Sequence, residues 1–361
     1  MQNRTKNIIV TIGFVMILIG IFFTNIIAKD KQISTTERRK LAQLPYISLA
    51  KIISGDVTEK WEDYVTDQFV ARDLFRTIKS AWSINIFRQK DNNDLFIKDG
   101  AIYKMEYPLN EKNLEKSLDK INNVYKKYLL NMNVYYAIIP DKNYYLKDDD
   151  HLKIDYVKVR EITRKKLPEM NYIDIWDDLK LDDYYKTDLH WKQENLQNVV
   201  KQIQQSMNLE SASGVNYIKK YAGDFFGTYY GQLGLKLPAD RLHILTNGIL
   251  ESCTTYNYET KKLGKVYEQT TSADKYDIYL SGATPIITVE NPNAKIEKEL
   301  LLFRDSFGSS LAPLLVENYS KITLIDLRYI SSKLLENYIV FEDQDVLFLY
   351  STVVLNQNVF K

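Results

Sequence analysis

Short, continuous apolar runs alternate with segments of helical periodicity in the C-terminal third of the chain. The apolar runs lie at 299–303 (ELLLF), 321–326 (KITLID) and 346–350 (VLFLY). A helix is expected at about 309–318, and a shorter helix before the last run. Strands that are apolar on both faces are typical of a parallel sheet that helices cover on both sides. The pattern therefore predicts an α/β fold, a three-layer sandwich around a mainly parallel sheet.

The remainder of the chain carries further elements with less regular spacing. Apolar side chains recur at helical spacing in four segments, which predict helices at about 58–88, 114–129, 157–167 and 196–203. β-rich runs predict strands at 134–139 and 172–176, and a hairpin at 95–103 that turns at Asp99 and Gly100. The interval from about 211 to 294 is rich in Gly, Tyr and Thr, and we interpret it as a strand-rich insertion that passes over the sheet.

An uncharged apolar segment at residues 8–28 is long enough to cross a bilayer core of about 30 Å. No small-x-small cleavage site follows it, so we expect an uncleaved signal anchor rather than a removed signal peptide. Residues 1–7 would then form a cytoplasmic tail and residues 29–56 a juxtamembrane linker. Residues 57–361 would form the main domain, outside the cytoplasm. Basic residues after the segment outnumber those before it, which a plain positive-inside count reads as the opposite orientation.

The composition restricts the possible ligands. Forty-eight Lys and Arg residues balance 47 Asp and Glu residues, so the net charge of +1 gives no electrostatic reason to expect nucleic acid as a partner. The single cysteine, Cys253, cannot form an internal disulfide, and no Cys/His cluster suggests a metal site. We expect Cys253 and two of the three histidines, His151 and His243, to be structural.

A serine follows the first C-terminal apolar run, in FRDSFG at 303–308. Active groups of parallel α/β sheets collect where a strand ends and a helix begins. Ser306 is expected at such a point, where the free backbone N–H groups of a helix N-terminus can stabilise an oxyanion. That position suits a nucleophile. Alternatively, Asp305 or Ser306 serves only as the N-cap of the following helix.

The third histidine lies in TDLHW at 187–191, two residues after an acid. On an extended segment such residues point the same way, so Asp188 can fix the tautomer of His190 and leave its other ring nitrogen for Ser306. This arrangement predicts a triad in the chain order Asp, His, Ser. A surface Asp–His pair and a two-ligand metal site are the alternatives. Trp191 is expected to pack under His190.

Four further residues are candidates for binding the oxyanion or the substrate. The backbone N–H of Ser306 is the first expected oxyanion donor. Arg328 and Tyr329 follow the run at 321–326 and are expected near the same edge of the sheet, although Arg328 can equally pair with Asp326. Lys142 and Asn143, just past the predicted strand at 134–139, are alternatives.

Seven motifs together resemble the DHHW family of bacterial extracytoplasmic proteins, relatives of the alginate O-acetyltransferase accessory proteins with a fold similar to SGNH hydrolases. The motifs, which span residues 37 to about 355, are ERRKLAQLP (37–45), PDKNYY (140–145), YYKTDLHW (184–191), DFFGTYYGQLG (224–234), LLFRDSFGSSLAPLL (301–315), IDLRYI (325–330) and VLFLYSTVVLN at the C-terminal end. The resemblance assigns the acid, the histidine and the serine of the family motif to Asp188, His190 and Ser306.

The chain departs from the family pattern at three places. Leu189 replaces the first histidine of the family name, on the side of the segment expected to point away from the acid and base. The run LSGATP at 280–285 lacks the asparagine that relatives place in an oxyanion hole. Arg304 replaces the glycine that precedes Asp-Ser in esterase relatives, which weakens a simple esterase interpretation.

The resemblance implies a membrane-anchored O-acetyltransferase of the cell envelope that modifies an exported polysaccharide or cell-wall polymer through an acetyl-Ser306 intermediate. A polytopic membrane-bound O-acyltransferase (MBOAT-type) partner would supply the acetyl group from cytoplasmic acetyl-CoA, and neither a bound cofactor nor a metal is implied. Such chemistry places the main domain outside the cytoplasm, against the charge count. The alternatives are a carbohydrate esterase and a non-catalytic polysaccharide-binding or assembly factor.

Overall fold

The computed structural model describes residues 2–46, 56–147, 150–209, 216–269 and 272–361. The chain divides into two compact units. Unit 1 comprises Met1–Asn92 and Tyr230–Lys236, and unit 2 comprises Asn93–Tyr229 and Leu237–Lys361. The unit that carries the main sheet therefore begins at Asn93 and not at the expected residue 57, because the helices expected at 58–88 pack within unit 1.

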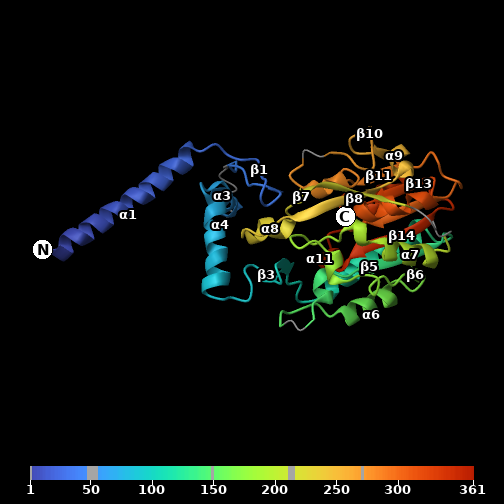
Figure 1. Ribbon diagram of the computed structural model, residues 1–361, viewed down its shortest axis with the longest axis horizontal. Helices are drawn as coiled ribbons and strands as arrows, with labels where there is room; N and C mark the ends of the chain where they lie inside the picture. Colours follow the sequence, from blue (N-terminus) through green and yellow to red (C-terminus); the bar gives the residue numbers. More distant parts are fainter. Residues whose placement is uncertain (1, 47–55, 148–149, 210–215, 270–271) are drawn as a thin grey trace. The chain divides into compact units, whose positions relative to one another are not determined.

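An eight-stranded sheet, shown in Figure 1, forms the centre of unit 2 in the order β10-β9-β11-β13-β12-β14-β5-β6. The strands from β13 to β6 are parallel, and β10, β9 and β11 join them antiparallel. Their bounds are β5 Val134–Ile139, β6 Asn171–Tyr172, β9 Thr254–Asn257, β10 Lys262–Gly264, β11 Ile286–Glu290, β12 Glu299–Arg304, β13 Lys321–Ile325 and β14 Asp345–Ser351. The mainly parallel α/β sheet expected from the C-terminal pattern is thus confirmed.

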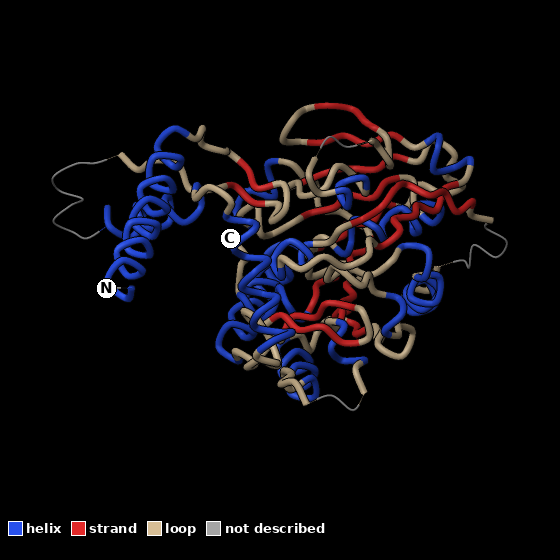
Figure 2. Tube along the Cα trace, turned by 60° about the vertical axis from the view of Figure 1, so that its left-hand side comes forward, coloured by secondary structure: helices blue, strands red, loops and turns tan. Residues whose placement is uncertain are grey.

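The core of unit 2 lies on both faces of this sheet, because its central strands are buried along almost their whole length. All residues of β14 and Leu300 to Arg304 of β12 are buried. Figure 2 shows the strands in red and the helices that lie beside them in blue. The α-helices of unit 2 are α5 Glu111–Tyr128, α6 Tyr156–Lys166, α7 Gln197–Ser206, α9 Gly248–Ser252, α10 Phe307–Leu311 and α11 Thr352–Gln357, while α8 Thr228–Leu233 runs from unit 2 into unit 1.

Short 3₁₀ segments connect many of these elements. They are η2 Lys142–Tyr145, η3 Leu181–Asp183, η4 Gln193–Asn195, η5 Lys275–Ile278, η6 Ala312–Asn318 and η7 Ser332–Asn337. The helix expected at 309–318 begins earlier, at Phe307, and becomes 3₁₀ from Ala312. Pro313 explains the change, since it lacks the N–H that would continue the α-helical ladder.

The expected insertion at 211–294 is only partly separate from the main sheet. Its strands β9, β10 and β11 extend the sheet itself, while β7 Ile218–Phe225 and β8 Asp240–Thr246 form a separate two-stranded sheet. Antiparallel strands can leave one face in water, and in β9 only Thr255 is buried. Residues 211–215 lie outside the described residues. The expected strand at 172–176 pairs only at Asn171–Tyr172.

The hairpin expected at 95–103 is confirmed as β3 Leu95–Lys98 and β4 Ala101–Lys104. Its turn has positive φ at Asp99 (50°) and Gly100 (72°), a conformation that favours Asp-Gly and Asn-Gly pairs. The turn residues therefore explain the hairpin.

Unit 1 contains α1 Gln2–Ile27, β1 Ile33–Ser34, β2 Arg39–Lys40, α3 Asp56–Gln68, α4 Arg72–Ala81 and the π-helical turn η1 Trp82–Ile86. Among the described residues, one helix, Arg4–Ile27, is long and apolar enough to cross a membrane, with a mean hydropathy of 2.4. The expected linker at 29–56 is partly structured, because β1 and β2 pair as a short hairpin. Its residues 47–55 lie outside the described residues.

Candidate active site

A bent loop presents His190. An isolated antiparallel bridge joins Tyr184 to Trp191, and the N–H of Tyr185 donates to the carbonyl of His190 over 3.0 Å. Asp188 lies at the bend, where its Oδ1 accepts the backbone N–H of His190 over 3.0 Å. The expected extended segment is therefore wrong in detail. The acid and the histidine still meet, because this local hydrogen bond folds the chain back on itself.

Three side chains form one continuous hydrogen-bonded line. Asp188 Oδ1 lies 2.6 Å from His190 Nδ1, and His190 Nε2 lies 2.7 Å from Ser306 Oγ. Ser306 directly follows β12 and Asp305, more than a hundred residues from His190 in sequence. The structure thus brings together the three residues of the predicted triad at the carboxyl end of a central strand.

The hydrogen bonds of Asp188 determine which nitrogen of His190 can accept the proton of Ser306. Asp188 is fully buried, and its Oδ2 accepts the backbone N–H of Thr228 over 2.6 Å. Burial acts to raise the pKa of Asp188, but the charge of His190 and the hydrogen bonds from His190 and Thr228 outweigh it and hold the pKa below its usual value. An ionised carboxylate only accepts, so His190 Nδ1 carries the ring proton and Nε2 can accept one from Ser306.

Aromatic rings fix the plane of the imidazole. The ring of Tyr276, in η5, stacks on His190 with centroids 4.0 Å apart and 14° between the planes, and Phe307 lies 4.8 Å away. Trp191 does not have the expected position under His190. Its indole N–H donates to Ser310 Oγ over 2.9 Å and ties the loop to α10. Ser306 is half-buried, so the end of the line remains accessible.

A second carboxylate holds the loop from the other side. Asp240 accepts from the backbone N–H of Thr187 over 2.7 Å and from its hydroxyl over 2.6 Å. The backbone of Gly227 approaches the loop so closely that an added Cβ would lie 2.3 Å from Asp188 Cβ. Only glycine fits this approach, which also brings the N–H of Thr228 to Asp188. The motif at 224–234 therefore supports the acid.

Lys142 lies behind the loop and not at the oxyanion. It is 3% exposed, and its Nζ donates to the carbonyls of Tyr185 and Asp188 over 3.0 and 2.9 Å. Burial lowers the pKa of Lys142 to about 7. Asn143 is also buried and donates to the carbonyl of Lys104 over 2.6 Å. Both residues therefore bind protein backbone and not the expected oxyanion or substrate: Lys142 holds the loop that carries His190, and Asn143 holds the end of β4.

The strand-to-helix turn leaves one backbone donor available. Asp305 acts as the helix cap, because its Oδ1 accepts the N–H of Phe307 over 3.0 Å and its Oδ2 that of Ser351 over 2.8 Å. Ser306 makes no side-chain cap, and no described residue accepts its backbone N–H. The N–H of Ser306 is therefore suited to donate to an oxyanion formed at its own Oγ.

Arg328 pairs with a neighbouring acid, the alternative raised from its sequence. Its Nε and Nη2 donate to Asp326 over 2.9 and 2.7 Å, and its guanidinium lies 5.3 Å from the ring of Tyr329. Arg304 is fully buried, with Nη1 3.7 Å from Asp326 and Nη2 3.4 Å from the carbonyl of Gly282. Within the described part of the chain, no hydrogen bond joins Arg328 or Tyr329 to Ser306.

The remaining reactive residue types lie elsewhere. The ring of His151 stacks on Phe96 with centroids 3.6 Å apart, and His243 Nδ1 lies 2.8 Å from Glu194 Oε1. Burial raises the pKa of the Cys253 thiol to about 11, so the thiol stays protonated at neutral pH. Within the described ranges, no group of three or more His, Cys, Asp or Glu side chains could hold a metal ion.

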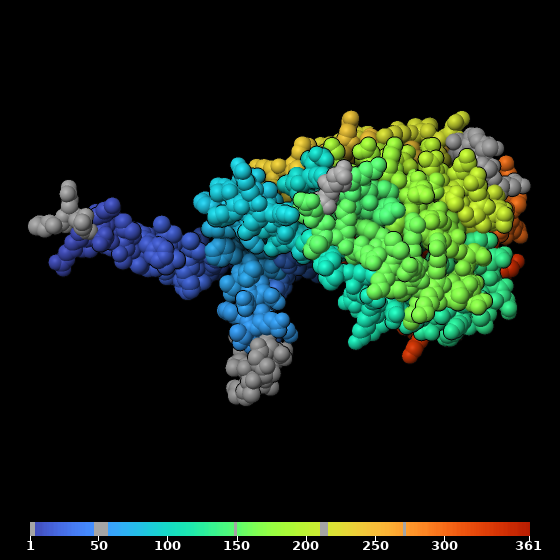
Figure 3. Space-filling model, turned by 90° about the horizontal axis from the view of Figure 1, so that it is seen from below, coloured from blue at the N-terminus to red at the C-terminus, as the bar shows by residue number. Residues whose placement is uncertain are grey.

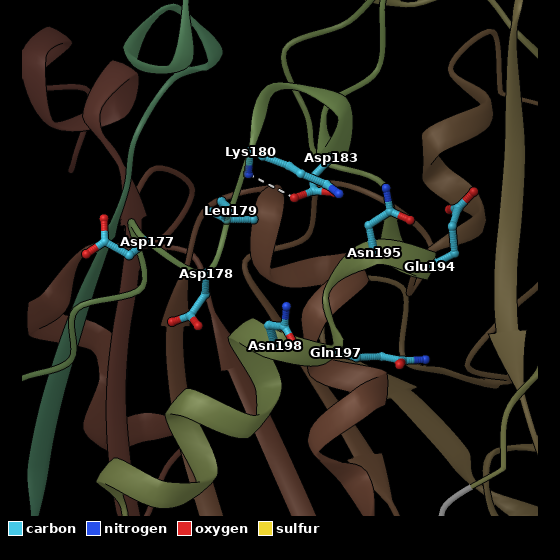
Figure 4. Close-up of a pocket in the computed structure, with 9 residues that line it drawn as sticks. All are labelled: Asp177, Asp178, Leu179, Lys180, Asp183, Glu194, Asn195, Gln197 and Asn198. Carbon is cyan, nitrogen blue, oxygen red and sulfur yellow. Dashed lines mark hydrogen bonds between the residues drawn. The ribbon is translucent and has the colours of Figure 1, made fainter.

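A polar pocket of about 340 Å³ lies at the base of the loop at 184–191, which carries His190 (Figure 4). It is lined by Asp177, Asp178, Leu179, Lys180, Asp183, Glu194, Asn195, Gln197 and Asn198. Figure 4 shows Asp183 bonded to the N–H of Lys180, over 2.9 Å. The pocket residues flank the loop on both sides in sequence, and none of them was expected to be functional.

The fold matches those of solved structures, although no protein-family model and no curated protein sequence matches the chain. A DHHW family protein from Eubacterium siraeum superimposes with a TM-score of 0.61 at 18% identity, over 74% of this chain and 95% of that one. The chain has the fold of a DHHW family protein. Bacillus cereus PatB1 shares this DHHW fold, with a TM-score of 0.59 at 21% identity over 75% of this chain and 99% of its own. A second PatB1 structure, with a sulfonyl adduct, gives 0.57 at 20% identity over 74% and 96%.

Sequence reasoning missed the residues that support the predicted triad. Tyr276, Asp240 and Thr228 come from three different elements and meet the loop only in the folded chain. The sole signal for any of them was the motif at 224–234, which contains Gly227 and Thr228. Tyr276 and Asp240 stand in no motif that the spacing of the sequence singles out.

Proposed function

We propose that this protein is a membrane-anchored O-acetyltransferase that acetylates hydroxyl groups of an exported polysaccharide or cell-wall polymer. The proposal rests on two hydrogen bonds: Asp188 Oδ1 lies 2.6 Å from His190 Nδ1, and His190 Nε2 lies 2.7 Å from Ser306 Oγ. Such an Asp–His–Ser arrangement activates a serine hydroxyl for acyl transfer. The motif resemblance to the DHHW family supports acetyl as the transferred group.

The proposed reaction has two steps. Ser306 Oγ attacks the carbonyl carbon of the acetyl donor while His190 Nε2 takes the hydroxyl proton, and His190 then gives that proton to the departing donor group. In the second step His190 takes a proton from a polymer hydroxyl, which attacks acetyl-Ser306, and the proton returns to Ser306 Oγ. General-base help contributes about 10²–10⁴ in rate. An oxyanion donor such as the N–H of Ser306 contributes about 10²–10³.

The donor and the setting are further parts of the proposal. An MBOAT-type membrane partner would deliver acetyl derived from cytoplasmic acetyl-CoA, and unit 2 would lie outside the cytoplasm with α1 as a single-pass anchor. No residue of the proposed mechanism needs a metal, because the Asp188–His190 pair supplies the base. The apolar helix Arg4–Ile27 supports the anchor by its length and composition.

The first test labels the nucleophile directly. After incubation with an activated acetyl ester, mass spectrometry should find one acetyl adduct on Ser306. A sulfonyl fluoride is a second probe, since PatB1 has been solved with a sulfonyl adduct. Ser306→Ala should abolish both adducts. Ser309→Ala is the matched control, because Ser309 is buried three residues away and its hydroxyl has no hydrogen-bond partner within the described part of the chain.

The second test identifies the acceptor. Release of acetyl from the activated ester is measured with and without an oligosaccharide acceptor. A transferase gives acetylated oligosaccharide, whereas an esterase releases acetate at the same rate in both reactions. Polymer acetylation in cells that persists with Ser306→Ala, together with the absence of any adduct, would overturn the enzymatic proposal in favour of a polysaccharide-binding factor.

A further inference from the structure

Helix α4 in unit 1 turns its polar side inward. The Arg76 guanidinium donates to the carbonyls of Gly231 and Gln232, each over 2.8 Å. Thr77 Oγ1 donates to the carbonyl of Gly234 over 2.7 Å, and Ser80 Oγ to that of Leu233 over 2.5 Å. These hydrogen bonds dock α4 on the segment Tyr230–Lys236 of the same unit.

The opposite side of α4 and η1 is apolar and exposed. We call its residues the apolar stripe: Leu74 (58% exposed), Phe75 (51%), Ile78 (44%), Trp82 (51%), Ile86 (60%) and Phe87 (65%). Four of them recur every fourth residue, so they share one side of the helix. A helix on the surface of a water-soluble protein has the reverse arrangement. Figure 3 shows the surface of this part of unit 1 in light blue to cyan.

Unit 1 also contains the helix that is suited to cross a membrane. The stretch Arg4–Ile27 has 24 residues and so spans about 36 Å, more than the roughly 30 Å of a bilayer core. The Asn25 side chain, near its C-terminal end, accepts the backbone N–H of Val70 over 2.8 Å. Val70 precedes α4 by two residues. The segment that leads into α4, four residues before the apolar stripe begins, is therefore hydrogen-bonded to the end of α1, where a spanning helix leaves the hydrocarbon.

We propose that the apolar stripe lies in the boundary between headgroups and acyl chains of the bilayer that α1 crosses. Interfacial helices carry Trp, Phe and Leu on the buried side and basic residues beside them. The stripe provides the first set, and Lys79 in the last turn of α4 provides a basic residue, whereas Arg72 pairs with Glu37. Tryptophan is also enriched at membrane interfaces, where its amphipathic ring fits the headgroup level.

A second copy of the chain or a membrane-protein partner would also cover an apolar surface. The link from Val70 to Asn25 favours lipid, because it brings the stripe to the bilayer without requiring another protein. The inference depends on α1 crossing a membrane and is independent of the proposed acetyltransferase activity.

Tryptophan fluorescence of the full chain in vesicles tests this position. Trp176 and Trp191 are 1% and 0% exposed, so Trp61 and Trp82 report on the surface. We expect brominated phosphatidylcholine, with some anionic phosphatidylglycerol, to quench part of the tryptophan emission. This quenching should be lost in Trp82→Phe and kept in Trp61→Phe. Equal quenching in the wild type and Trp82→Phe would refute the proposal, and so would extraction of the chain from vesicles by carbonate.

A charge in the stripe gives an independent result. Ile78→Glu should reduce the quenching of Trp82 and increase its quenching by aqueous iodide. Ile218→Glu is the matched control, because Ile218 is 60% exposed on β7 of unit 2 and lies outside the stripe. Circular dichroism verifies that both variants fold. Unchanged quenching in Ile78→Glu, or a stripe covered only when a second protein is added, would mean that lipid is not its occupant.

Discussion

Replacing Asp188 by asparagine keeps the shape of the side chain and removes its charge. In the wild type Oδ1 accepts from His190 Nδ1 over 2.6 Å, and Oδ2 accepts from the N–H of Thr228 over 2.6 Å. An amide has one acceptor and one donor end, so it can satisfy only one of these partners. With the NH₂ group toward His190, the ring proton moves to Nε2, and His190 can no longer take the proton of Ser306.

The other orientation is costly in a different way. With its oxygen toward His190, the introduced amide would point its NH₂ group at the N–H of Thr228, leaving two buried donors face to face at a cost of about 1–3 kcal/mol. Either orientation loses the negative charge that stabilises protonated His190. A comparable substitution in a serine protease lowers kcat about 10⁴-fold, or roughly 5 kcal/mol of barrier. We expect a loss of about 10³- to 10⁴-fold here.

The rate of sulfonyl adduct formation on Ser306, followed by intact mass, measures this loss without requiring a known acceptor. Asp177→Asn is the matched control, because Asp177 is exposed in the polar pocket. If Asp188→Asn reacts within about tenfold of the wild type, Asp188 does not orient the base, and the reasoning from the hydrogen bonds fails.

Asp188 also predicts a dependence of stability on pH. Its pKa is held below the usual value in the folded chain, so the unfolded chain binds the proton more readily. The carboxylate therefore contributes stability above its unfolded pKa, and this contribution is lost as the pH falls through the folded pKa. Asp188→Asn should be less stable than the wild type at neutral pH, and the difference in unfolding free energy should decrease in acid.

Three further outcomes are expected. Lys142→Met leaves the carbonyls of Tyr185 and Asp188 without their donor, which should cost about 1–3 kcal/mol for each in chemical denaturation. Because burial lowers the pKa of Lys142 to about 7, the unfolding free energy of the wild type should rise by about 1.4 kcal/mol per pH unit from pH 7 toward 10. The unfolding free energy of Lys142→Met should not show this rise. Gly227→Ala would place a Cβ 2.3 Å from that of Asp188. It should slow adduct formation at Ser306 even at temperatures below its melting temperature, where the variant is folded.

The sequence predicted the central elements well, because the signal for a buried parallel strand is local. Residues 299–303, 321–326 and 346–350 are apolar on both faces, and each became a strand of the sheet within a residue or two. Antiparallel strands at the edge carry a weaker signal. The Gly, Tyr and Thr content of 211–294 made this interval look like a separate insertion, although β9, β10 and β11 pair with the sheet.

The meeting of Asp188, His190 and Ser306 was expected from residue types, from the rule that parallel α/β sheets collect active groups at strand ends, and above all from the motif resemblance to the DHHW family. The orientation of the loop was not, because residues distant in sequence determine it. Lys142 binds carbonyls of its backbone, Asp240 binds its N–H groups, and Tyr276 fixes the imidazole plane. No spacing within 184–191 indicates any of these partners.

Arg304 shows how a departure from a family pattern can leave the nucleophile in position. An added Cβ on Gly308 would lie 2.6 Å from Arg304 Cβ, so the helix behind Ser306 can approach the strand only because residue 308 is glycine. The large residue before Asp305 is thus accommodated by a small one in the next turn. The Arg304 guanidinium meanwhile lies near Asp326 and the carbonyl of Gly282, which joins the loop at 280–285 to the strand end that carries Ser306. The replacement of glycine therefore changes what supports the serine and leaves Oγ 2.7 Å from His190 Nε2.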